Sequence, residues 1–195
     1  LGMEVAADVA SEVVALAEQA VRQLDAPVSQ ALLQLQMLVD HALDTEFGGL
    51  AAFAGLSGPQ RAWALLEGAA RNIAHMCAKW LNVGFCQGNF NSDNCAAGGF
   101  TLDYGPFGFC ELFDPRFQPW TGGGDHFSFF NQPAAAETNF HMFWTALRPL
   151  LADDQEALAK LDHIRDEFTE TMERELEIMW TQKLGLTTAD PALLN

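Results

Sequence analysis

Positive charge is scarce in this chain. Its 195 residues hold 10 Lys and Arg against 26 Asp and Glu, which gives a formal net charge of −16. Such a charge repels nucleic-acid phosphates unless a basic patch is sharply localised, and the sequence has no such patch. Nor does any apolar run reach the roughly 18 residues that a membrane-spanning helix requires. We therefore expect neither nucleic-acid binding nor a membrane span.

Cysteine is also sparse, and its spacing does not favour metal binding. The four cysteines form no CxxC pair, whereas zinc sites usually combine thiolates or imidazoles that lie close together in the sequence. A chain of this length also needs no disulfides to fold. We expect free, buried thiols. The N-terminal residues are acidic where a leader peptide would carry Lys or Arg, so no targeting signal can be read.

Apolar residues recur at three- and four-residue spacing over much of the chain, which predicts a mainly α-helical protein. The predicted helices cover residues 5–24, which Pro27 ends, 32–43, 59–80, 133–147 and a long stretch over 161–179. The acidic residues of the last helix are expected to form a solvated face. We divide the chain into N-terminal helices and a loop (1–58), a core helix with a central loop region (59–132) and C-terminal helices (133–195), all within one domain.

The central region has a different composition. Residues 83–132 hold nine of the sixteen glycines and ten of the fifteen phenylalanines. We predict a small β-hairpin here, with its turn at 97–99 and a returning strand at 100–102, so that Asn94 and Asp103 face each other. Mg²⁺ prefers oxygen ligands, commonly one or two from the protein with phosphate oxygens and water. Asn94 and Asp103 are therefore candidate metal ligands.

The triplet that follows the returning strand also suggests a phosphate-transfer site. Asp103, Tyr104 and Gly105 have the layout of the Asp-Phe-Gly segment of protein kinases. Protein kinases place four residues between the catalytic Asp and the metal-binding Asn, whereas Asp93 and Asn94 are adjacent here, so an ordinary protein kinase is not expected. The structural alternative is that Asp93 only caps a turn and Asp103 only ends a strand.

A longer series of motifs points to one family. The chain contains Asn-Ser-Asp-Asn at 91–94 and Thr-Leu-Asp-Tyr-Gly-Pro-Phe-Gly-Phe at 101–109, followed by Asp-Pro, His-Phe-Ser-Phe and Asn-Gln-Pro. In this order the motifs closely resemble the selenoprotein O family. The resemblance implies the C-terminal large lobe of a protein-kinase-like fold that transfers AMP from Mg-ATP to Ser, Thr or Tyr hydroxyls of proteins. It also implies that Asp93 accepts the proton, that Asn94 and Asp103 hold Mg²⁺, and that Asp103 serves ATP binding.

The chain departs from the family pattern in three respects. Gln87 stands where the family usually has His, and 125–127 read Asp-His-Phe in place of a Gly-Arg-Tyr-like segment. No glycine-rich nucleotide-binding motif or kinase-like lysine is found, so the N-terminal lobe of the family is missing from this sequence. We expect the chain alone to be inactive, because ATP would lack the cations that hold its phosphates. A separate small-lobe chain or a larger assembly would then supply them, with a protein as substrate.

The resemblance leaves a second interpretation open. The chain could be a noncatalytic scaffold subunit of a larger complex, derived from a selenoprotein O-like protein and docked through its acidic helices and phenylalanine-rich surface. An intracellular location is expected in either case: the mitochondrion, or else a plastid, in a eukaryote, and the cytoplasm in a bacterium.

Overall fold

The computed structural model describes residues 28–120 and 124–190. Its contacts separate two units, Leu1–Leu38 and Val39–Asn195. The described part of the first unit, 28–38, is helical, and the helical conformation continues to residue 46 in the second unit. The helix predicted over 32–43 is therefore confirmed, whereas the one predicted over 5–24 lies outside the described residues.

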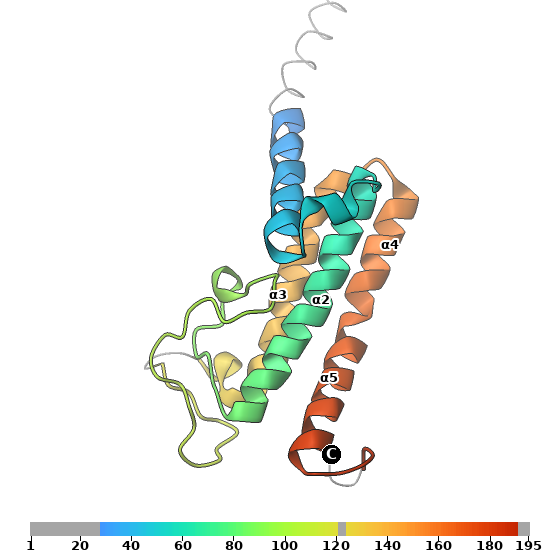
Figure 1. Cartoon of the computed structure of the whole chain (residues 1–195). Coiled ribbons are helices and arrows are strands. Elements are labelled where there is room, and N and C mark those ends of the chain that lie inside the picture. The colour runs from blue at the N-terminus through green and yellow to red at the C-terminus, as the bar shows by residue number, and fades with distance from the viewer. Residues whose placement is uncertain (1–27, 121–123, 191–195) are drawn as a thin grey trace, which may run out of the picture. The chain divides into compact units, whose positions relative to one another are not determined.

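The helix α2, Gly58–Val83, is the central element of the second unit. The Ser57 hydroxyl caps its first turn by accepting a hydrogen bond from the Gln60 backbone amide. The Gln60 side-chain oxygen in turn accepts one from the Ser57 backbone amide. Pro59 sits in the first turn, where its missing N–H costs nothing. The chain leaves the helix at Gly84. Figure 1 shows α3 on one side of α2, and α4 and α5 on the other.

Three further helices complete the second unit: α3 (Gln132–Leu147), α4 (Gln155–Asp166) and α5 (Phe168–Lys183). The prediction of one unbroken helix over 161–179 is wrong, because the chain divides at Glu167, which has a ψ of −5°. A regular α-helix has a ψ near −42°. No proline or glycine marks this bend, and the apolar spacing continues through it unchanged. The sequence therefore gives no signal that the helix ends there.

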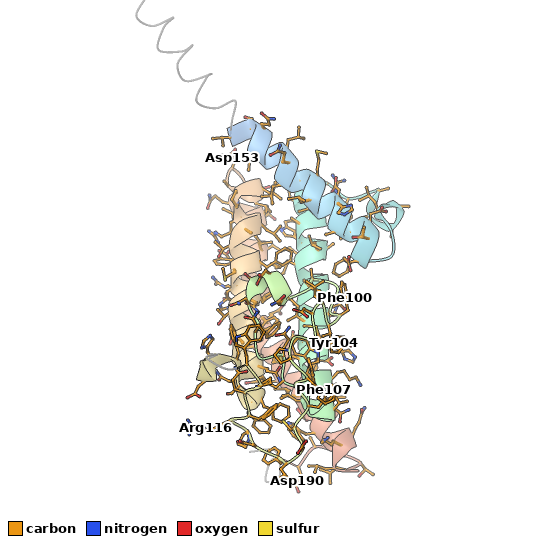
Figure 2. The ribbon with its side chains drawn as sticks, turned by 90° about the vertical axis from the view of Figure 1, so that its left-hand side faces the viewer. Phe100, Tyr104, Phe107, Arg116, Asp153 and Asp190 are labelled. Carbon is orange, nitrogen blue, oxygen red and sulfur yellow. The ribbon has the colours of Figure 1, made fainter. Side chains whose placement is uncertain are left out.

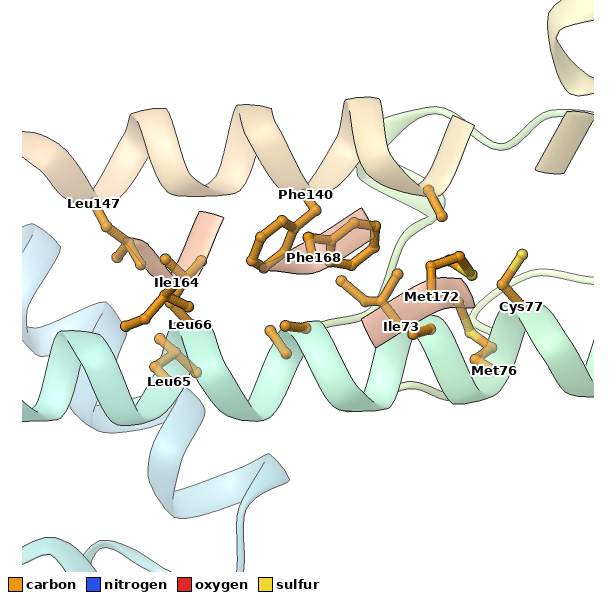
Figure 3. Close-up of a cluster of buried hydrophobic side chains, with 14 of the residues drawn as sticks. Leu65, Leu66, Ile73, Met76, Cys77, Phe140, Leu147, Ile164, Phe168 and Met172 are labelled. Carbon is orange, nitrogen blue, oxygen red and sulfur yellow. The ribbon is translucent and has the colours of Figure 1, made fainter. Parts of the chain in front are cut away.

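The core is formed where these helices meet. Phe140 of α3 and Phe168 of α5 are fully buried and stack with their ring centroids 4.3 Å apart. Figure 3 shows them above the apolar face of α2, which contributes Leu65, Leu66 and Ile73. Placing Phe168 in this core positions α5 along α2.

The central region from 84 to 131 contains no strand among its described residues, so the predicted hairpin is not seen as such. Two isolated antiparallel bridges are present, Phe85 with Phe109 and Cys95 with Thr101. A 3₁₀ turn, Ser92–Asn94, precedes Cys95 and takes this part of the chain out of the extended conformation that a ladder needs. Further 3₁₀ turns occur at Leu50–Phe53, Asp125–Phe127, Phe129–Asn131 and Arg148–Leu151.

Within the described residues, no helix combines the length and the apolar character needed to cross a membrane.

Candidate active site

The loops that carry the candidate residues start at the C-terminal end of α2. Beyond Gly84, the Cys86 amide donates to the Gly108 carbonyl and the Cys110 amide donates to the Gly84 carbonyl, both at 2.8 Å. This pairing holds 84–86 against 108–110. A Cβ at Gly108 would lie 2.1 Å from the Cys86 carbonyl oxygen, so only glycine allows the two segments to approach this closely.

A tight turn at 96–99 separates Asn94 from Asp103. Its Gly99 has a φ of 72° and packs so closely on α2 that a Cβ would lie 2.5 Å from the Asn72 carbonyl oxygen. The Cys95–Thr101 bridge closes the turn. From α2, the Trp80 ring nitrogen donates to the Thr101 hydroxyl at 2.9 Å. The turn is thereby anchored on α2, with Asn94 and Asp103 just outside its two ends.

Asp93 and Asn94 lie in the 3₁₀ turn before the bridge. The Asp93 side chain is exposed and Asn94 is half-buried. The amide nitrogen of the Asn94 side chain donates to the Asn89 carbonyl at 2.9 Å. Because this bond occupies the nitrogen end of the amide, the oxygen of Asn94 is the end available to a cation.

Asp103 is exposed on the opposite side of the same turn. One of its carboxylate oxygens accepts a hydrogen bond from the Gly105 amide at 2.9 Å, and its backbone carbonyl accepts one from the Gln87 side chain at 2.6 Å. The first bond is made within the Asp103–Gly105 turn and leaves the second carboxylate oxygen for a ligand. Asp103 is thus held at its backbone and partly free at its side chain.

Buried amide side chains join these loops to α3. Gln87 and Gln132 are 1 % and 0 % exposed, and Asn139 is also buried. The Gln132 amide donates to the carbonyls of Phe85 and Phe129, and Asn139 donates to the carbonyl of Phe90. In the sequence, Gln87 stands out as a departure from a family pattern, and neither Gln132 nor Asn139 carries a predicted role. The one sequence signal for Gln132 is its place in the Asn-Gln-Pro motif.

The donor set suits a magnesium ion held jointly with phosphate. No group of three or more His, Cys, Asp or Glu side chains within the described ranges could hold a metal. Mg²⁺ needs no such cage, because it keeps several waters and usually takes one or two carboxylates together with substrate phosphates. One carboxylate oxygen of Asp103 and the amide oxygen of Asn94 fit that requirement.

Two neighbouring cavities open beside the turn that carries Asp93. One has a volume of about 350 Å³ and the other about 320 Å³, and Ser92, Asn139 and Met142 line both. The larger also reaches His126, where the sequence departs from the family pattern. A third cavity, of about 310 Å³, is lined by polar residues of α2 and α5 with Glu167, and combines Arg71 and Arg174 with glutamates of the predicted acidic face.

The four cysteines are free, as predicted. Burial raises the pKa of the Cys77 thiol strongly, that of Cys86 to about 11 and that of Cys95 to about 12. Burial also raises the pKa of Cys110, with a further contribution from the Asp114 charge. Since the thiolate is the reactive form, none of these thiols is activated as a nucleophile.

Large apolar side chains are exposed in the loops that carry Asp103, including its chain neighbours Leu102 and Tyr104. Tyr104 and Phe107 are 60 % and 85 % exposed. Figure 2 shows Phe100, Tyr104 and Phe107 along one side of the molecule, with Asp153 at the opposite end of the helices. The exposed apolar residues of this region are Phe100, Leu102, Tyr104, Phe107, Leu112, Phe113, Trp120 and Phe130. We call them the aromatic surface.

The Asp-Asn and Asp-Tyr-Gly motifs lie in loops on a helical scaffold, and comparison with known proteins identifies the family. A family model described as protein adenylyltransferase SelO matches residues 25–194. The chain belongs to this family.

Curated bacterial relatives carry the name protein nucleotidyltransferase YdiU. The protein of Variovorax paradoxus is 36 % identical over 167 residues, which cover 84 % of this chain and 32 % of the relative. The protein of Methylorubrum populi is 37 % identical over 168 residues, covering 82 % and 32 %. This chain therefore spans about a third of the length of these relatives. Their bacterial origin gives no support to the expectation of a mitochondrion or plastid.

Proposed function

We propose that this chain forms the catalytic, metal-binding part of a protein adenylyltransferase with a protein-kinase-like fold, in which it is the large lobe. In this reaction a Ser, Thr or Tyr hydroxyl of a protein attacks the α-phosphorus of ATP. The new O–P bond forms as the bond from the α-phosphorus to the bridging oxygen breaks, and pyrophosphate leaves. The hydroxyl proton passes to the Asp93 carboxylate, which is exposed and so open to a substrate.

Asn94 and Asp103 hold Mg²⁺ in this proposal. The cation would offset the negative charge on the phosphates during transfer. The observation that carries the proposal is the turn between these residues: the Cys95–Thr101 bridge closes it, and α2 anchors it through Trp80. A rigid base of this kind is what a transfer reaction needs, because its rate depends on fixed geometry at the reacting atoms.

A second polypeptide element must cover this site for ATP to bind. The chain carries a net charge of −16, and Asp93 and Asp103 add negative charge where the phosphates would lie. The aromatic surface around Asp103 gives the covering element an apolar area to pack on. We infer that a nucleotide-binding lobe supplies basic residues to the phosphates from this side. The scaffold alternative has no support from the family comparison.

Labelled ATP tests the proposed reaction. The chain is incubated with candidate protein substrates and ATP labelled at either the α- or the γ-phosphate. It is assayed alone and together with the part of the Variovorax paradoxus relative that it does not cover. We expect protein-bound label from the α-phosphate only, and only in the combined sample. Label from the γ-phosphate would indicate phosphorylation instead. No label from either position, with both components folded and associated, would refute group transfer.

Matched variants identify the site. Asp103→Ala should abolish the label, whereas Asp153→Ala removes an exposed carboxylate at the opposite end of the helices and should leave the label unchanged. Equal labelling by the two variants would contradict the role proposed for Asp103.

A further inference from the structure

The side chain of Gln87 bonds to both loops of the candidate site. Its nitrogen donates to the backbone carbonyl of Asp103 at 2.6 Å, and its oxygen accepts from the backbone amide of Asn89 at 2.9 Å. The same Asn89 amide also donates to the backbone carbonyl of Gln87 at 2.8 Å. The carbonyl of Asn89 in turn accepts the side-chain amide of Asn94 at 2.9 Å. A continuous series of hydrogen bonds therefore runs from Asp103 through Gln87 and Asn89 to Asn94.

The backbone of Gln87 is bound in turn by a second buried glutamine, Gln132. Its backbone amide donates to the side-chain oxygen of Gln132 at 2.9 Å. The nitrogen of Gln132 is used by the carbonyls of Phe85 and Phe129, at 3.0 and 3.1 Å. Both glutamines are buried with their amide groups bonded, and breaking such a bond inside a protein leaves an unsatisfied polar group. Gln87 is thus fixed to the first turn of α3 as well as to the two loops.

We propose that Gln87 is a positioning residue, which sets the separation between Asn94 and Asp103. This inference rests on the proposed function, since the two residues are the metal ligands assigned there. Partners of metal ligands that fix ligand orientation from outside the coordination sphere commonly change metal affinity 10- to 100-fold when removed. Gln87 does not contact the side chains of the two proposed ligands. It acts on them indirectly, through the backbone of Asp103 and through Asn89.

The chemistry of the amide defines the substitutions that test this role. Glutamine donates at one end and accepts at the other. Leucine has a similar size and does neither, so Gln87→Leu breaks both bonds. Neutral histidine has one donor and one acceptor nitrogen, so Gln87→His can restore both. Gln87→Met, as long as glutamine and without its polar ends, serves as a second variant if Gln87→Leu does not fold.

A control variant separates positioning from general loosening. Asn139 is a buried amide that donates to the carbonyl of Phe90, in the same loop as Asn89. The bond it makes there does not reach Asp103. Asn139→Ala therefore loosens the 89–94 loop while leaving the bond from Gln87 to Asp103 in place.

The experiment measures Mn²⁺ affinity by electron paramagnetic resonance on the full chain. In parallel, NMR follows the amide chemical shifts of Asn89, Asp103 and Gly105. We expect Gln87→Leu to weaken Mn²⁺ binding about tenfold or more and to shift the amides of Asn89, Asp103 and Gly105. Gln87→His should recover most of the affinity. Asn139→Ala should leave the Asp103 and Gly105 shifts as in the wild type.

The outcomes for the positioning role of Gln87 can be told apart from those for the metal site. If the wild type binds Mn²⁺ and a folded Gln87→Leu or Gln87→Met variant binds it equally well, the positioning role is overturned. An equal loss of affinity in Asn139→Ala, with the same shifts at Asp103, would overturn it too. If the wild type binds no Mn²⁺ without phosphate ligands, the metal site is decided by the labelling experiment with Asp103→Ala, and the NMR shifts decide the role of Gln87. Unchanged shifts at Asn89 and Asp103 in a folded Gln87→Leu or Gln87→Met variant exclude the link between the loops.

Discussion

The helices and the loops of the second unit are held by different forces. Between α2, α3 and α5 the buried contacts are apolar, and the polar pairs His75–Glu175 and Glu137–Thr169 lie at the surface. In the 84–131 region Phe85, Phe90 and Phe129 are also buried. Many other large apolar side chains are exposed there, and buried amides such as Gln87 and Gln132 join the loops to one another and to α3. Apolar packing sets no bonding direction, whereas a hydrogen bond requires a narrow range of distance and angle. The loops are therefore held by directional bonds on a base that the helices stabilise.

The largest effect is expected in the helical core. Phe168→Ala removes a fully buried ring that stacks on Phe140. We expect the free energy of unfolding to fall by about 3–5 kcal/mol, because the cavity cannot close between packed helices. Urea unfolding followed by circular dichroism measures it. A loss below about 1 kcal/mol would mean that the core repacks easily. It would contradict the claim that buried apolar packing holds the helices.

The second effect tests how the turn is seated on α2. Gly99→Ala forces a left-handed residue to carry a Cβ against the backbone of Asn72. We expect a loss of about 2–3 kcal/mol, from the backbone conformation and the steric overlap together. Gly185→Ala is the matched control, because Gly185 has a similar φ of 68° with open space around it. It should lose only about 1 kcal/mol. Equal losses would show that the overlap with α2 contributes nothing.

These two regions also differ in how far sequence predicts them. The helices were predicted from apolar spacing, and Pro59 and Leu147 lie at or next to the true ends of α2 and α3. The break at Glu167 was missed, because no residue type marks it and only the packing of Phe168 requires it. Within the loops, motif order supplied the candidate residues Asp93, Asn94 and Asp103, and their roles stay a prediction.

The connections between the loops could not be predicted in the same way. Gln87 reaches Asp103 across 16 residues and Gln132 across 45. Such bonds follow no period along the chain, and the sequence does not distinguish a buried glutamine from an exposed one. The motif match supplies candidate residues for the site, and the structure supplies the hydrogen bonds that hold the loops on which they lie.

Thiol reactivity compares the two regions directly. Burial raises the pKa of Cys77 in α2, whereas Cys110 in the loops is less buried, although its pKa is raised as well. With iodoacetamide at pH 7.5 we expect Cys110 to be modified first and Cys77 only on unfolding, as mass spectrometry of peptides can show. Early modification of Cys77 would mean that α2 opens locally.

The same pKa values set a direction for stability against pH. The folded state keeps the thiol proton of Cys86 and Cys95 up to a pKa of about 11 and about 12, above the ordinary value of 9.0. The unfolded chain therefore releases these protons first as pH rises. Stability should be unaffected by these thiols below about pH 8 and should fall as pH rises from 9 towards 11. Burial also raises the pKa of Cys77 and Cys110, so these thiols contribute to the same fall. Replacing Cys86 and Cys95 with alanine should reduce the slope without removing it, and an unchanged slope would exclude these two thiols as contributors.

A smaller effect is expected at the hydrogen bond between helix and turn. Trp80→Phe removes the ring N–H that donates to Thr101 and also part of a buried ring that packs on Phe85 and Phe90, so it should cost more than the roughly 1 kcal/mol of the hydrogen bond alone. Thr101→Val removes the same bond from the other side. In a double-mutant cycle the two changes together should cost less than their sum. Strict additivity would mean that the bond does not hold the turn on α2.

The smallest effect on stability is expected on the aromatic surface. Phe107 is 85 % exposed, so Phe107→Ser should change the free energy of unfolding by no more than about 0.5 kcal/mol.

If the aromatic surface is covered by a second polypeptide, the same change should weaken association with the remaining part of the Variovorax paradoxus relative, measured by analytical ultracentrifugation. The Phe107 ring also approaches Phe109, with centroids 5.1 Å apart. A loss above 1 kcal/mol would show that this pair stabilises the loops by apolar packing, and the division between an apolar scaffold and hydrogen-bonded loops would no longer hold.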